Sequence, residues 1–103
     1  MAKILLLITT ESDKDLAKNL AKKIIDGKYA ACCTFKEINS IYRWKGEIEI
    51  TTEVEILIKS TPDKLQNLIK VVQQESSYET PQIINKNFNS EDKYYNWVKN
   101  MAS

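Results

Sequence analysis

Two adjacent thiols, Cys32 and Cys33, are the only cysteines of the chain, which has no histidine. Thiolates bind soft ions such as Cu(I), whereas a closed zinc site needs about four ligands, mostly Cys and His. The thiols lie in a segment that we expect to be extended, and successive side chains of a strand point to opposite faces. An intrachain zinc site or a disulfide between the two is therefore not expected. Cys33 is predicted to pack in the core; Cys32 is the candidate metal ligand, through copies related by symmetry, or else a small apolar residue.

A row of glutamates could bind hard cations through carboxylate oxygens. These glutamates alternate with aliphatic residues, Ile48, Ile50, Val54, Ile56 and Ile58, and comprise Glu47, Glu49, Glu53 and Glu55. Strict alternation is typical of a strand with one apolar and one polar face. The row is therefore predicted to be a solvated or charge-paired face, with Lys36 opposite Glu55 if the strand pairing is unbroken.

The segment Tyr42-Arg43-Trp44-Lys45 combines aromatic and basic side chains, a pattern that stacks on single-stranded nucleic acid. Against this interpretation, the chain has 15 basic and 14 acidic residues, and an acidic strand follows the segment directly. Nucleic-acid partners are not expected. Aromatic residues at the tip of a hairpin more often pack against a neighbouring subunit, so Tyr42 and Trp44 are predicted to be interface residues.

The segment "SSYETP" is the remaining candidate site. Tyr78 and Glu79, together with Lys59 and Glu53, could line a cleft between subunits that binds a small anion or metabolite. Catalysis there would need Glu79 or a lysine as the base, because no histidine is available. Ser76 and Ser77 have no visible activating partner, and a chain with only two glycines has no phosphate-binding loop. No enzymatic activity is therefore expected.

Composition predicts one domain spanning residues 1–103, with 43% hydrophobic residues and a net charge of +1. The short apolar run near the N-terminus does not have the length of a membrane-spanning helix or the small-residue cleavage site of an export signal. We therefore expect a cytoplasmic protein with reduced thiols and no membrane partner.

Periodicity predicts alternating strands and helices. A capping box of Ser12 and Asp15 is expected to begin the first helix and Gly27 to end it, Lys45-Gly46 to form a turn, and Pro62 to open the second helix. The expected elements are a strand over 3–10, a helix after 12, strands over 30–44 and from 47 onward, a helix from 62, a strand over 82–86, and a helix over 91–101. This order predicts an α+β, ferredoxin-like βαββαβ fold, an antiparallel sheet with its two crossover helices on one face, a long central hairpin and a C-terminal helix.

Two features predict a homo-oligomer. The first strand is apolar on both faces, although the helices can cover only one. The strand after Gly46 has a predicted length of about 40 Å, whereas a compact chain of this size is about 33 Å across. The hairpin should therefore extend beyond its own domain, where a partner chain would cover it.

The motifs "AAC", "SIYRWKGEIE", "EVEILIKS", "SYETPQII" and "YYNWV" together resemble the CutA divalent-cation tolerance family. The resemblance implies a cytoplasmic homotrimer with an architecture similar to the PII signalling proteins, and no firm catalytic activity. It places Cys32 on the family's cysteine, and it places three further groups on family motifs: Tyr42, Trp44, Lys45 and Gly46 on the hairpin, Glu53 and Lys59 on the long strand, and Tyr78, Glu79, Pro81 and Trp97 in the C-terminal third. The chain has Ser76-Ser77 where the family usually has His-Pro.

Three functional hypotheses follow. The first is a non-catalytic homotrimer in divalent-cation tolerance that binds copper or another divalent cation weakly, or that signals in a PII-like manner, with Trp97 also at the trimer interface. The second is a sensor that binds a small metabolite or anion in the intersubunit cleft without a physiological metal role. The third is an enzyme that uses Glu79 and Lys59 on a metabolite.

Overall fold

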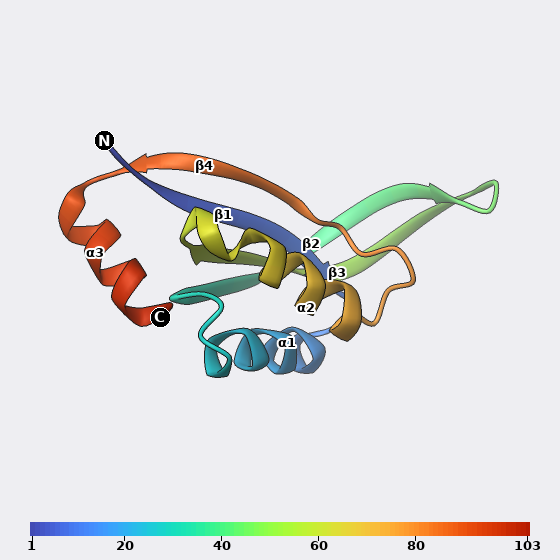
Figure 1. Ribbon diagram of the computed structural model, residues 1–103. Coiled ribbons are helices and arrows are strands. Elements are labelled where there is room, and N and C mark those ends of the chain that lie inside the picture. Colours follow the sequence, from blue (N-terminus) through green and yellow to red (C-terminus); the bar gives the residue numbers. More distant parts are fainter.

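The computed structural model describes residues 1–103 as four strands, three α-helices and one turn of 3-10 helix (Figure 1). The elements in chain order are β1 (Ala2–Glu11), α1 (Lys14–Asp26), β2 (Cys32–Trp44), β3 (Glu47–Ser60), η1 (Pro62–Lys64), α2 (Leu65–Glu75), β4 (Ile84–Ser90) and α3 (Asp92–Met101). All strand pairs are antiparallel, in the order β2-β3-β1-β4. The predicted ferredoxin-like α+β fold is confirmed.

One face of the sheet carries the hydrophobic core. Alternate residues of β1 and β3 point to this face, where they pack against α1 and α2; the largest are Leu5, Leu7, Ile56 and Ile58 from the strands and Leu20, Ile24, Leu68 and Val72 from the helices. The other residues of β1, including Leu6 and Ile8, are only partly buried on the opposite face. Apolar residues on both sides of β1 therefore leave one face of the sheet incompletely covered within this chain.

The ends of α1 differ in part from the expectation. The N-cap is Asp13, whose carboxylate accepts a hydrogen bond of 2.8 Å from the Leu16 amide, so the predicted capping box of Ser12 and Asp15 is wrong. Gly27 ends the helix as predicted. The residue with positive φ is the next one, Lys28, at 59°. Glycine is required at position 27 by close packing, because a Cβ there would lie 2.3 Å from Cε2 of Tyr29.

The last strand and the helices beside it also differ from the expectation. Strand β4 runs over Ile84–Ser90 rather than 82–86. Its three asparagines have low strand propensity, but pairing with β1 determines the bounds, with Ser90 opposite Ala2. Pro62 opens a 3-10 turn ahead of α2. In α3, Val98 is buried whereas Trp97 is 45% exposed, so the predicted apolar face is only partly covered.

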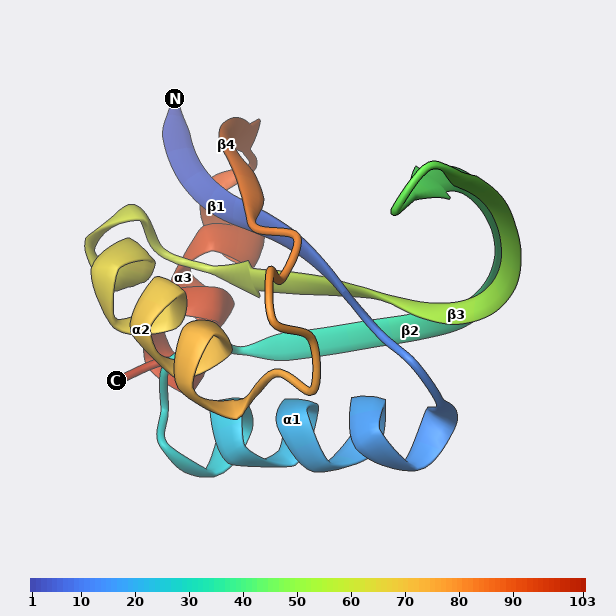
Figure 2. The same ribbon diagram turned by 90° about the vertical axis from the view of Figure 1, so that its right-hand side faces the viewer.

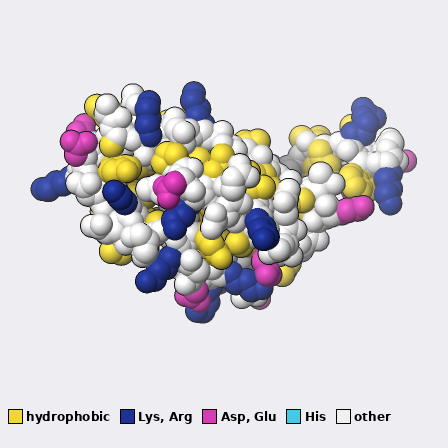
Figure 3. Space-filling model, in the orientation of Figure 1, with side chains coloured by type: hydrophobic (Ala, Val, Ile, Leu, Met, Phe, Trp, Pro, Cys, Tyr) yellow, Lys and Arg dark blue, Asp and Glu magenta, His cyan; other side chains and the backbone are white.

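The long hairpin of β2 and β3 dominates the shape of the molecule. Lys45 (φ 50°) and Gly46 (φ 82°) form its two-residue turn, in which both residues adopt positive φ. The molecule measures 46 × 25 × 21 Å, and the hairpin extends and curls beyond the end of β1, away from the helices (Figures 1 and 2). Figure 3 shows it as a protrusion with hydrophobic surface, to which Ile41 (69% exposed) and Ile50 (73%) contribute. The predicted overhang is confirmed.

Candidate functional site

A cavity of about 720 Å³ lies where the hairpin leaves the body of the protein. Three segments line it: the end of β1 with Thr10, both strands of the hairpin, and the loop between α2 and β4. The hairpin contributes Ser40, Ile41, Tyr42, Trp44 and Glu53, and the loop contributes Ser77, Tyr78, Glu79, Thr80, Pro81 and Gln82. We call this cavity the hairpin-base pocket. Its volume is within the range of sites for small molecules.

Tyr78 and Glu53 form the central polar contact of the pocket. The Tyr78 hydroxyl donates a hydrogen bond of 2.7 Å to Oε1 of Glu53. Burial, followed by the hydrogen bond and the negative charge of Glu53, raises the pKa of Tyr78 above its ordinary value of 10.0. The phenol therefore remains a protonated donor at neutral pH, and it holds the loop against β3 at a fixed point.

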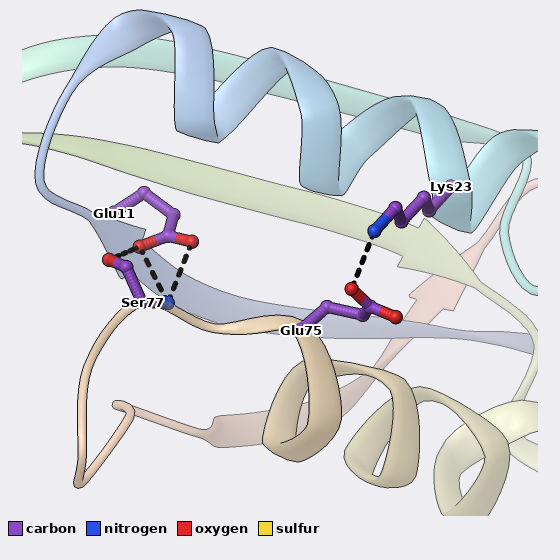
Figure 4. A network of polar contacts seen from close by, with 4 residues as sticks. All are labelled: Glu11, Lys23, Glu75 and Ser77. Atoms are coloured by element: carbon purple, nitrogen blue, oxygen red, sulfur yellow. Dashed lines mark hydrogen bonds and ion pairs between the residues drawn. The ribbon is translucent and has the colours of Figure 1, made fainter.

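A second contact anchors the same loop to β1. Glu11 is 1% exposed, and its carboxylate accepts hydrogen bonds from the hydroxyl of Ser77 (2.5 Å) and from the Ser77 amide (3.2 and 3.4 Å), as Figure 4 shows. Ser76 adds a local contact, since its hydroxyl accepts a hydrogen bond of 3.1 Å from the Tyr78 amide. The two serines therefore fix the backbone that carries Tyr78 and Glu79.

The role of Glu11 was not predicted from the sequence. The available signal was a single glutamate that follows Thr9 and Thr10 at the end of a largely apolar strand, because a buried carboxylate needs donors. Its donors come from Ser77, which is 66 residues away in the chain. Ser77 was singled out only as a departure from the His-Pro of the resembled family. A proline at that position could not donate through its backbone nitrogen.

The two cysteines point to opposite faces of the sheet, as predicted. Cys33 pairs with Ile58 and packs against the core, whereas Cys32 pairs with Lys59 on the face without core packing. Burial, with a smaller contribution from Cys32, raises the pKa of the Cys33 thiol to about 12. Cys33 is thus a protonated packing residue, as predicted. Within one protomer no three Cys, Asp or Glu side chains lie close enough to bind a metal ion together.

The four residues predicted to share a cleft are only partly together. Glu53, Tyr78 and Glu79 line the hairpin-base pocket, but Lys59 does not. Lys59 lies on the same face of β3 six residues beyond Glu53, a separation of about 20 Å along a strand. It is a neighbour of Cys32. A cleft that contains both Lys59 and Glu53 therefore requires a second protomer.

The residues predicted for a trimer interface lie at both ends of the molecule. Tyr42 (42% exposed) and Trp44 (51%) are on the hairpin, where they also line the pocket. Trp97 is on α3, at the end of the molecule opposite the hairpin tip, and stacks on Tyr94 with ring centroids 5.8 Å apart (Figure 1). Half of each tryptophan surface is thus available to a partner. In the glutamate row, Glu55 lies opposite Lys36 as the unbroken pairing predicts, whereas Glu53 accepts the hydrogen bond from Tyr78.

The fold and these motifs agree with a match to a family model described as "CutA1 divalent ion tolerance protein", which covers residues 5–101. The chain belongs to the CutA1 family. Its curated relatives include the divalent-cation tolerance proteins CutA of Yersinia pestis (strain Pestoides F) and of Yersinia pseudotuberculosis serotype O:1b (strain IP 31758). Each of them is 33% identical over 96 residues, which covers 91% of this chain and 81% of the relative. The name describes tolerance of cations and no reaction.

Solved structures of CutA1 proteins superimpose closely on this chain. The protein from Ehrlichia chaffeensis matches with a TM-score of 0.95 and 32% identity, covering 100% of this chain and 98% of that one. CutA from Synechococcus elongatus PCC7942 matches with a TM-score of 0.95 and 31% identity, covering 100% of this chain and 93% of that one. The long hairpin and terminal helix thus belong to the CutA1 fold. No helix of the chain has both the length and the apolar character needed to cross a membrane.

Proposed function

We propose that this CutA1 chain is a non-catalytic, homotrimeric module of divalent-cation tolerance that binds a small ligand in the hairpin-base pocket. One observation carries the proposal: the pocket is formed by a loop that two separate contacts hold in place, Ser77 on Glu11 and Tyr78 on Glu53. A pocket held in this way has its shape before a ligand arrives, which lowers the entropic cost of binding. A ligand there would contact the hairpin, so binding could change the position of the hairpin and signal in a PII-like manner.

The homotrimer is supported by uncovered apolar surface in two places. The face of the sheet without core packing exposes Ile84 (54%) and Phe88 (45%) on its edge strand, and the hairpin exposes Ile48 (58%) on its other side. A stable monomer seldom exposes large contiguous apolar patches, so this surface favours association. Copies of the chain would cover the exposed surface of Tyr42, Trp44 and Trp97 that lies outside the pocket.

The absence of catalysis is supported by the protonation of the pocket. A general acid or base works best with a pKa near the operating pH. The raised pKa of Tyr78 moves this hydroxyl further from neutrality, and the chain has no histidine to replace it. Glu53 already accepts a hydrogen bond from the Tyr78 hydroxyl. Its role is therefore to hold Tyr78 and its loop in place rather than to transfer protons.

A thermal-shift screen of divalent ions and charged or neutral metabolites tests the pocket, because a ligand that binds only the folded state raises the unfolding temperature. We expect at least one compound to raise it saturably for the wild type. The shift should be lost in Trp44→Leu and retained in Glu37→Gln, a variant of an exposed glutamate outside the pocket. Shifts that persist unchanged in Trp44→Leu would refute the site, and a screen in which nothing shifts would refute the proposed binding.

Copper binding by Cys32 is a second candidate, and the placement of the thiol favours it. Cys32 is half-buried on the face where copies of the chain would meet, and it lies opposite Lys59 in the β2–β3 pairing. Cu(I) prefers such soft ligands. Titration with Cu(I) under reducing conditions should give one stoichiometry for wild type and Cys33→Ser and a lower one for Cys32→Ser. Equal stoichiometries in all three proteins would remove Cys32 as a ligand.

We also propose a cytoplasmic location, because a copper-binding Cys32 must remain reduced. A solved relative from Archaeoglobus fulgidus, 25% identical, carries the word "periplasmic" in its name. Fractionation of cells that express the full chain distinguishes the two compartments. Recovery in the periplasmic fraction would contradict the proposed location.

A further inference from the structure

The hairpin-base pocket has an unusual balance of charge and aromatic surface. Its lining includes two carboxylates, Glu53 and Glu79, and three aromatic rings, Tyr42, Trp44 and Tyr78. No lysine or arginine of the protomer lines it. Within one protomer, an anion in this cavity would face two carboxylates without a positive partner. This lining therefore disfavours the small anion, one of the two ligand classes that the sequence left open.

The same lining suits a positive charge in two ways. Carboxylates attract it directly, and the face of an aromatic ring attracts a cation within about 6 Å of its centroid, most strongly for tryptophan. Trp44 already shows this property, because Nζ of its neighbour Lys45 lies 5.9 Å from the centre of the ring. A cation can therefore approach a face of this ring, and in the protomer alone that cation is Lys45.

A hard divalent ion fits this lining less well. Such ions take six or more oxygen ligands, mostly from carboxylates and carbonyls. Here Oε1 of Glu53 is already engaged by the Tyr78 hydroxyl, and no third acidic or thiol side chain joins the two glutamates. Ile41 and Pro81 add apolar surface, which contributes to the binding of alkyl groups and not of a hydrated ion.

From this lining we infer that the hairpin-base pocket binds an organic cation, an alkylated ammonium group whose charge faces Glu53 and Glu79 while its methyl groups contact Trp44 and its neighbouring rings. The inference rests on the proposed function, since it names the ligand class of the same pocket. Tyr78 positions the Glu53 carboxylate through its hydrogen bond. Lys45, whose Nζ lies over the Trp44 ring, is a competing cation.

Choline and 3,3-dimethyl-1-butanol are the matched probes, because they have the same shape and only choline carries the charge. Isothermal titration calorimetry on the intact protein should show saturable binding of choline chloride, one site per chain, and binding of the alcohol at least tenfold weaker. Glu53→Gln and Trp44→Leu should each weaken choline at least fivefold, and Glu37→Gln should leave it unchanged. Lys45→Met should tighten it, because the competing charge is gone.

The outcomes separate the two proposals. Equal binding of choline and the alcohol, or unchanged choline binding in both Glu53→Gln and Trp44→Leu, overturns the organic cation and leaves a ligand pocket. A metabolite anion or a divalent ion that saturates the pocket and displaces choline also overturns it. If no compound of any charge binds in calorimetry or shifts the unfolding temperature, the proposed function fails as well. Comparison of circular dichroism spectra ensures that each variant is folded.

Discussion

The contact between Glu11 and Ser77 is expected to stabilise the protein far more than a similar contact nearby. The Glu11 carboxylate is 1% exposed and accepts from the Ser77 hydroxyl at 2.5 Å. A hydrogen bond to a charged group contributes about 1.5–3 kcal/mol, and the cost of its loss is greater when the charge stays buried. Ser77→Ala should therefore lower the free energy of unfolding by about 1.5–3 kcal/mol.

The pair of Lys23 and Glu75 is the natural control, because it lies beside the first contact in Figure 4 and is as short, at 2.6 Å. Its side chains are 58% and 39% exposed. Exposed ion pairs contribute about 0–1 kcal/mol because water screens them. Lys23→Met should therefore cost less than Ser77→Ala, although the two contacts have similar geometry.

Urea unfolding at one fixed chain concentration measures both effects, since an oligomer's stability depends on concentration. A double-mutant cycle of Glu11→Met and Ser77→Ala should give a coupling energy of at least about 1 kcal/mol. The double variant should recover part of the loss, because the buried carboxylate that lost its hydroxyl donor is then absent. A coupling below about 0.5 kcal/mol, or a larger loss from Lys23→Met, would refute the argument from burial.

Three further predictions concern single groups. Thr9 Oγ1 is buried without a hydrogen-bond partner, so Thr9→Val should raise the free energy of unfolding by about 1 kcal/mol. Urea titration measures this change, and a destabilised variant would contradict the prediction. With the Cys33 pKa at about 12, only about one Cys33 thiol in ten thousand is ionised at pH 8. Iodoacetamide at pH 8 should therefore label Cys32 first, and rapid labelling that persists in Cys32→Ser would contradict this prediction. Tyr78 has a raised pKa in the folded state, so its contribution to stability is complete below pH 10.0 and is lost as the pH rises beyond that value, because the unfolded chain releases the proton first. Absorbance titration near 295 nm should show one late-ionising tyrosine that ionises earlier in Glu53→Gln, and identical titration curves would refute the assigned cause.

Much of this fold follows from local sequence patterns. Alternation from Ile48 to Ile58 determines which side of β3 is buried, and the pair Lys45-Gly46 determines the hairpin turn. The sequence predicts the start of strand β4 two residues too early, because its asparagines give no periodic signal and its bounds depend on pairing with β1. Asp13 replaced Ser12 as the N-cap because either residue type can accept the bond and only the backbone geometry selects one.

The site was less accessible from the sequence because it depends on contacts between distant segments. One motif predicts Tyr78 and Glu79 as site residues, and both line the same pocket as Glu53. The same prediction includes Lys59, which lies six residues beyond Glu53 on β3 and therefore about 20 Å from it. The anchor of Glu11 on Ser77 joins two residues that have no shared motif, so no local pattern could predict it.

The proposed function depends on the proposed homotrimer, in which copies of the chain would cover the hairpin and the exposed face of the sheet. Sedimentation equilibrium of the full chain at micromolar concentration tests this most directly. We predict a mass of three times the chain mass of 11.9 kDa. A mass equal to that of one chain would contradict the account.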